Sequence, residues 1–121
     1  MRRTIRCDSR APAAARRQVS EFLAGPDVST DVVNDVVLAV SELVTNAVDA
    51  GATAIELRVD VAEHQITMSV DDDTGGWPTP AIPDPSSTRG RGLAIVAKAA
   101  DHWNVERTRR GKRVTAFFAT G

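Results

Sequence analysis

The chain has 121 residues and a mass of 12.9 kDa, which is the size of one globular domain. Its 42% hydrophobic and 26% charged residues allow a closed core, and with only two Trp and three Phe that core must be mostly aliphatic. A formal net charge of -1 argues against a generally basic nucleic-acid-binding protein. Cys7 is the only cysteine, which excludes an internal disulfide, and no apolar run suits a signal peptide or a membrane span. We therefore expect a cytoplasmic protein.

The near-neutral total hides an uneven distribution of charge. Residues 1–17 hold six arginines against one aspartate, residues 18–88 hold thirteen acidic residues against one arginine, and residues 89–121 hold eight basic residues against two acidic ones. The three segments therefore carry +5, -12 and +6. Such a pattern either neutralises itself in the fold or assembles a site that needs both a cation and an anion.

The first half of the chain predicts two helices. Apolar residues recur on one helical face over residues 12–24, and a Gly-Pro pair stops the pattern. A second, longer helix is expected to begin after Ser29 or Thr30 and to end at Gly51, because Ser and Thr cap helix starts and Gly ends helices.

A hairpin and an irregular segment follow. Apolar residues alternate over residues 52–61 and again over residues 66–72, which is typical of two antiparallel strands. Residues 73–90 are rich in Pro and Gly and cannot form a regular element. A stretch of this length is more often a lid or binding loop than a connector.

The last third predicts one helix from Leu93 and two closing strands, at residues 103–108 and 112–119. The element order favours an α+β fold of two layers, with about three helices on one face of a mixed, mostly antiparallel sheet. We expect residues 1–121 to form a single domain, in which residues 1–10 are flexible or form an edge strand.

Three groups of residues could carry chemistry, and the first lies on the second helix. Glu42, Asn46 and Asp49 follow one another at i, i+4 and i+7 and share one stripe of this helix. Amide and carboxylate oxygens at this spacing suit Mg²⁺, and a carboxylate one turn away could act as a general base. The alternative is a solvated helix face.

The second group ends the second strand of the hairpin. If Val70 faces inward then Asp72 does so too, and a buried aspartate must find hydrogen-bond donors, of which the exocyclic amine of adenine is one. Gly75 and Gly76 would let the backbone pass close to a flat ligand. The alternative is an acidic turn followed by a loop.

The third group precedes the third helix. Gly90 and Gly92 stand before a helix start, whose free amides favour phosphate, and Arg89 and Arg91 add cationic donors. A dinucleotide-binding fingerprint is excluded because Ile95 occupies the position of its third Gly. Alone, this G-x-G pattern more often marks a helix-start turn.

Together the motifs E-L-V-T-N-A, D-D-D-T-G-G-W-P, G-R-G-L and G-K-R-V resemble the N, G1 and G2 boxes and a late strand of the gyrase, Hsp90, histidine-kinase and MutL ATPase superfamily. The length and the segment A-D-H-W-N-V are similar to its small bacterial anti-sigma-factor serine kinases. The resemblance covers the chain from about Ala11 and implies the Bergerat-type ATP-binding fold, in which residues 73–90 are the ATP lid.

The resemblance also implies roles for single residues. Asn46 would bind Mg²⁺ between the phosphates, Glu42 would be the base, and Asp72 would accept from the adenine amine with help from Thr115. The remaining nucleotide-binding residues that it implies are Asp49, Gly76, Arg89, Gly90, Arg91, Gly92 and Leu93.

One box departs from the family pattern D-x-G-x-G. Thr74 occupies the first Gly position if Asp72 is the aligned aspartate, and Asp73 occupies it if Asp71 is. We favour Asp72 because Gly76 then also falls in pattern. A Cβ at this position could restrict the turn and reshape nucleotide binding. The segment N-A-V-D-A-G-A-T is in turn more similar to the mismatch-repair and chaperone members.

The resemblance implies a Mg-ATP-binding regulator of the anti-sigma type, with serine/threonine kinase activity toward a STAS-type anti-anti-sigma antagonist. Its partners would be that antagonist and a sigma factor, with no nucleic acid and no membrane, and a homodimer is left open. Two alternatives remain: a non-catalytic nucleotide-binding module, which Thr74 favours, and a stand-alone ATPase domain of histidine-kinase or MutL type.

Overall fold

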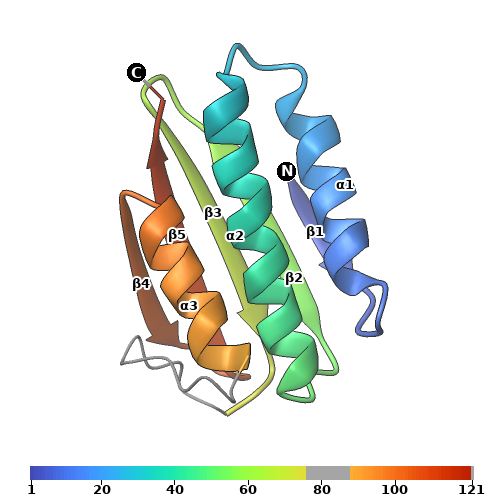
Figure 1. The fold of residues 1–121 in the computed structure, drawn as a ribbon. Coiled ribbons are helices and arrows are strands. Elements are labelled where there is room, and N and C mark those ends of the chain that lie inside the picture. Colours follow the sequence, from blue (N-terminus) through green and yellow to red (C-terminus); the bar gives the residue numbers. More distant parts are fainter. Residues whose placement is uncertain (76–87, 121) are drawn as a thin grey trace.

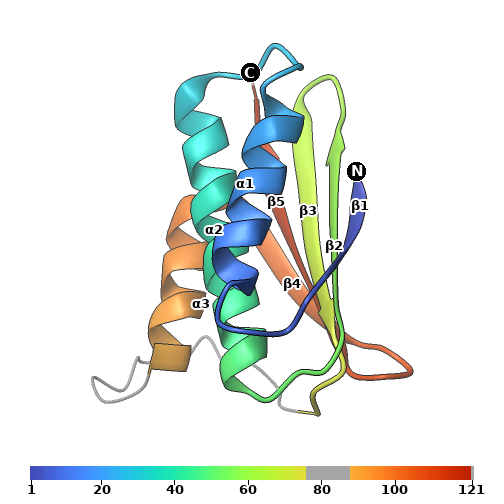
Figure 2. The ribbon, with the colours of Figure 1, turned by 90° about the vertical axis from the view of Figure 1, so that its right-hand side faces the viewer.

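The computed structural model describes residues 1–75 and 88–120, and along residues 88–93 it describes the backbone alone. Within these residues, five strands form one antiparallel sheet in the order β1-β2-β3-β5-β4. Three helices cover one face of this sheet, as the edge-on view in Figure 2 shows. The expected two-layer α+β sandwich is therefore confirmed. In chain order the elements are β1 (Arg2–Ile5), α1 (Ala11–Leu23), α2 (Thr30–Asp49), β2 (Ile55–Val61), β3 (Gln65–Asp72), α3 (Thr88–Ala99), β4 (His102–Arg107) and β5 (Lys112–Ala119) (Figure 1).

Helix α2 lies between the other two helices and begins and ends at clear signals (Figure 1). The Ser29 side chain accepts a hydrogen bond from the backbone N–H of Val32 at 3.3 Å, which caps the helix start. Gly51 has a φ of 88°, a left-handed conformation that suits glycine and ends the helix. Both ends agree with the sequence prediction.

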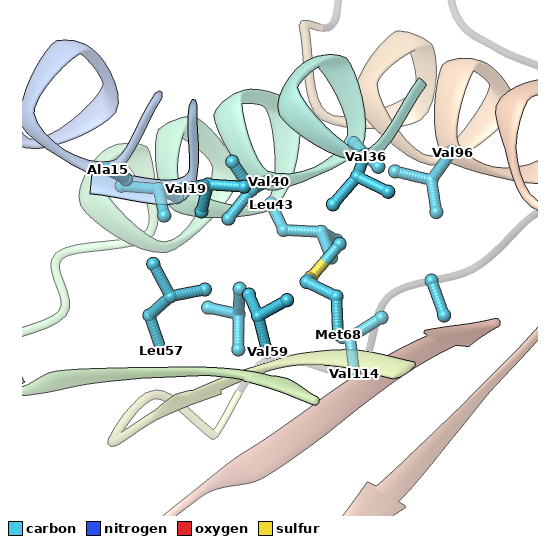
Figure 3. Packing of buried hydrophobic residues seen from close by; sticks show 14 of the residues in the cluster. Ala15, Val19, Val36, Val40, Leu43, Leu57, Val59, Met68, Val96 and Val114 are labelled. Atoms are coloured by element: carbon cyan, nitrogen blue, oxygen red, sulfur yellow. The ribbon is translucent and has the colours of Figure 1, made fainter. Parts of the chain in front are cut away.

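The core lies between the helices and the sheet and is aliphatic apart from Phe118. Alternate residues of each central strand face the helices and are buried, except Val61 at the end of β2. Figure 3 shows Leu43 of α2 above Met68 of β3, with Val40 and Val59 beside them. The other buried strand residues of this cluster are Ile5, Ile55, Leu57, Ile66, Val70, Val114, Ala116 and Phe118.

One element differs from the sequence prediction, and another decides between two forms that the prediction left open. Helix α3 begins at Thr88, five residues before Leu93, so Gly90 and Gly92 lie within its first turns rather than before it. Glycine has a low helix propensity, and for this reason the pattern hid the true start. Strand β1 pairs with β2 at the sheet edge, which is one of the two forms expected for residues 1–10.

Among the described residues, no helix is both long enough and apolar enough to cross a membrane.

Candidate functional site

Four segments that carry predicted site residues meet at one end of the sandwich. Strand β3 and helix α2 both end there, while α3 and β5 both begin there (the lower end in Figure 1). Helix α3 also packs along α2. The fold thus brings Asn46, Asp72 and Gly90 toward the same end, although they are far apart in the sequence.

Asp72 is buried at the end of β3 and faces the helices. The Lys112 ammonium lies 2.9 Å from its Oδ2 and donates to its Oδ1 at 3.0 Å. The backbone N–H and the hydroxyl of Thr74 also donate to Oδ1, at 2.8 and 2.6 Å. Lys112 further donates to the Thr74 hydroxyl at 2.6 Å. A buried carboxylate needs such partners, and here this chain supplies them itself.

Lys112 reaches Asp72 because the register of the two strands pairs them directly. Lys112 shares its side of β5 with Val114, Ala116 and Phe118, all of which face the helices. Lys112 was not among the predicted site residues, although the alternation from Lys112 to Phe118 carried the signal.

Thr115 does not assist Asp72 in this structure. It pairs with Ser69 of β3 and lies at an odd position of the β5 alternation, on the opposite face of the sheet from Lys112. Because successive side chains of a strand point to opposite faces, Thr115 and Asp72 are separated by the sheet. This corrects the expectation that Thr115 shares in recognising the adenine amine.

The three consecutive aspartates have different surroundings. Asp71 faces away from the helices and forms a two-pronged ion pair with Arg113, at 2.8 Å for each bond. Asp73 accepts from the backbone N–H of Thr53 at 2.8 Å and of Ala54 at 3.2 Å, and also from the Thr53 hydroxyl. Of the three, Asp72 is the aspartate on the helix side, which supports aligning it with the G1 box.

The bonds from Thr53 lower the pKa of Asp73 from 3.8 to about 2, with the bond from the Thr53 hydroxyl as the largest cause. Asp73 thereby ties the end of β3 to the loop between α2 and β2. The two residues that follow Asp72 are thus both held, Asp73 by Thr53 and the Thr74 hydroxyl by Lys112.

On helix α2, Glu42 and Asn46 are half-buried and Asp49 is exposed. Glu42 and Asn46 stand one helical turn apart, so their oxygens lie on the same stripe. Groups of three or more His, Cys, Asp or Glu that could hold a metal are absent from the part of the chain that the structure describes. Mg²⁺ needs no such group, because it takes one or two protein ligands with phosphate oxygens and water. An amide beside a carboxylate fits that requirement.

At the start of α3, where the phosphates are predicted to bind, the structure describes the backbone alone. The first turn of α3 contains Gly90, and the N–H groups of a first turn have no partner within the helix. Gly76 and most of the predicted lid, residues 76–87, lie outside the described residues, and so do the side chains of Arg89, Arg91 and Leu93. The roles expected for them stay predictions.

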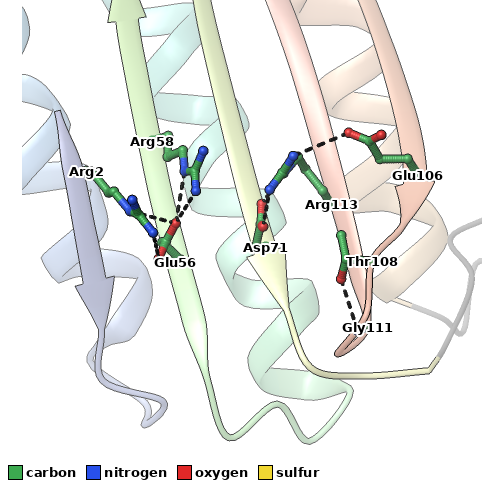
Figure 4. Close-up of polar contacts among 8 residues, drawn as sticks. All are labelled: Arg2, Glu56, Arg58, Asp71, Glu106, Thr108, Gly111 and Arg113. Atoms are coloured by element: carbon green, nitrogen blue, oxygen red, sulfur yellow. Dashed lines mark hydrogen bonds and ion pairs between the residues drawn. The ribbon is translucent and has the colours of Figure 1, made fainter.

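Part of the charge pattern of the sequence is neutralised across the strands of the outer face. Arg2 of the basic first segment bonds Glu56 of the acidic middle segment at 3.0 Å, and Arg58 bonds the same carboxylate (Figure 4). Arg113 of the basic last segment bonds Asp71 and lies 3.6 Å from Glu106 (Figure 4). On this face the alternative of self-neutralisation holds, whereas Lys112 carries a basic charge to the helix side.

Comparison with known proteins gives one family and one fold. A model of the histidine kinase-like ATPase domain matches residues 5–118. No curated protein matches the sequence. The crystal structure of the RsbU and RsbW domains of Rv1364c from Mycobacterium tuberculosis is similar, with a TM-score of 0.79 and 23% identity. The match covers 99% of this chain but 32% of that one, and at this identity it shows the fold alone.

Proposed function

Since the chain belongs to the histidine kinase-like ATPase domain family, we propose that it is a Mg-ATP-binding regulator of the anti-sigma type that phosphorylates an antagonist protein. One observation carries the proposal. A buried carboxylate, Asp72, ends a strand on the helix side, at the same end of the fold as Asn46 and the free amides of α3. ATP needs these three kinds of group. The carboxylate would accept from the adenine amine, Asn46 would hold the metal ion with its phosphates, and the amides would bind the outer phosphates.

In this proposal Asp72 binds the adenine base of ATP, and α2 and α3 bind its phosphates. Asn46 would hold Mg²⁺ together with phosphate oxygens, which suits the few protein ligands that this ion takes. The bound ion would supply neutralisation of phosphate charge. The first-turn amides of α3, with Arg89 and Arg91, would bind the transferring phosphate, and Asp49, Gly76, Gly92 and Leu93 would complete the site and its lid.

Glu42 would act as the base in the transfer step. Its carboxylate would take the proton of a Ser or Thr hydroxyl on the partner, while the hydroxyl oxygen bonds the terminal phosphorus and the bond to the leaving diphosphate breaks. The half-burial of Glu42, one turn from Asn46, supports this role. We place the activity in the cytoplasm, with a sigma factor and a STAS-type antagonist as the partners.

A second candidate function is a non-catalytic module that binds nucleotide to set the form of its lid. Thr74 favours it, because its side chain bonds both Asp72 and Lys112 at the position where the family pattern has Gly. A side chain at this position leaves less space for the adenine base than a glycine would.

The two candidates are separated by following labelled phosphate. The full chain is incubated with terminally labelled Mg-ATP in native lysate, beside the Glu42→Gln variant. The kinase proposal expects label on a partner protein, and a loss of at least about 100-fold in Glu42→Gln with ATP binding retained. Bound ATP without any labelled partner would instead support the non-catalytic module.

A further inference from the structure

The Asp72 carboxylate is already supplied with donors. A carboxylate offers about four acceptor positions in all. Three donors contact Oδ1, namely the Thr74 N–H, the Thr74 hydroxyl and the Lys112 ammonium, and Lys112 also contacts Oδ2 at 2.9 Å. Oδ1 is thus crowded, and a further donor, such as a purine amine, would bind Oδ2, where it competes with the Lys112 ammonium.

Lys112 is the donor that can leave. Thr74 is two residues from Asp72, and its N–H belongs to the backbone that Asp73 holds against Thr53. Lys112 instead reaches Asp72 through a flexible stem of four carbons, and other rotamers can carry its ammonium away. In this exchange a neutral amine would replace the charged ammonium. The charged donor forms the stronger hydrogen bond to a carboxylate.

We propose that Lys112 controls recognition of the purine amine, by holding the Asp72 carboxylate until an adenine displaces its ammonium. The inference rests on the proposed function and deepens it, because it makes Lys112 a specificity-determining residue of the same site. The amine of ATP then adds little affinity in the natural protein, since its bond to Asp72 replaces a charge-assisted one. Removing the Lys112 ammonium should increase the contribution of the purine amine to the affinity for ATP.

The test compares ATP with purine riboside triphosphate, which lacks the amine, each with Mg²⁺ and by calorimetry. The proteins are the full chain, Lys112→Met and Lys98→Met, a matched control because Lys98 is the other lysine and is exposed on α3. We expect the ratio of the two dissociation constants to be below about threefold in the natural chain and to rise at least about tenfold in Lys112→Met. Lys98→Met should keep the natural ratio.

If Lys112→Met does not fold, which circular dichroism would detect, a second variant keeps the test possible. Lys112→Gln keeps a neutral donor beside Asp72, so the carboxylate is not left bare, and its ratio should also exceed the natural one. An unchanged ratio in a folded variant that binds ATP overturns the role of Lys112 and leaves the proposed function standing. Absence of Mg-ATP binding in all of these proteins would overturn both.

Discussion

The Lys112 ammonium lies 2.9 Å from Asp72 Oδ2 on the helix side of the sheet, directly across from it in the register of β5 and β3. The next residues of the same strands, Arg113 and Asp71, form a second pair on the outer face at 2.8 Å. The side chains of the first pair are 11% and 4% exposed, and those of the second are 31% and 22% exposed. Two adjacent ion pairs of similar length therefore differ in burial as well as in the cation that forms them.

This difference predicts unequal costs for removing each cation. Lys112→Met should lower the free energy of unfolding by about 3 kcal/mol, because it leaves the Asp72 charge buried without its partner. Arg113→Met should cost about 1 kcal/mol or less, because water can solvate Asp71. Urea denaturation of both variants measures the two values. Equal costs would show that burial does not distinguish the pairs.

Gly111 is required where the β4–β5 turn meets the end of β3. A Cβ at this position would stand 2.1 Å from the carbonyl oxygen of Asp72 and 2.8 Å from the Asp73 Cα, and neither is a flexible side chain. Gly111→Ala should therefore cost about 2 kcal/mol by forcing the strands apart. Gly25→Ala is the matched control, since the nearest atom there is 4.0 Å away. Thermal melts that shift equally for both variants would contradict the steric argument.

We expect the free energy of unfolding to depend on pH through Asp73. Its pKa is lowered from 3.8 to about 2 by the bonds from Thr53 and Ala54, so the folded state favours the charged form. The resulting stability is fully present above about pH 4 and is lost as the pH falls toward 2. The difference in unfolding free energy between the natural chain and Asp73→Asn should shrink over this window. A difference that stays constant from pH 5 to about pH 2 would refute the assignment.

Periodicity in the sequence predicted most of the fold, because the apolar pattern of each element is regular. The Ser29 and Gly51 signals marked both ends of α2, and the alternation through Val70 predicted that Asp72 faces inward. The start of α3 escaped prediction because helix propensity gives no sign of a helix that begins with two glycines in its first turns.

Local patterns assigned the candidate site residues to their helices and strands, but they did not predict which of these residues pair. Which strand lies beside β3 is decided by tertiary packing, so the neighbour of Asp72 could not be read from local patterns. The resemblance therefore suggested Thr115, whereas strand register puts Lys112 opposite Asp72. A charged residue at an inward position of a strand was the available signal, since lysine is seldom fully buried unless it is paired.

The central claim, that this end of the fold binds Mg-ATP, is tested most directly by the affinity of Asn46→Ala for Mg-ATP. Asn34→Ala is the matched control, because Asn34 is exposed on the same helix. We predict that the natural chain and Asn34→Ala bind Mg-ATP alike, and that Asn46→Ala binds it at least about tenfold more weakly while it remains folded. Binding of Mg-ATP by Asn46→Ala as tight as that of the natural chain would contradict the account.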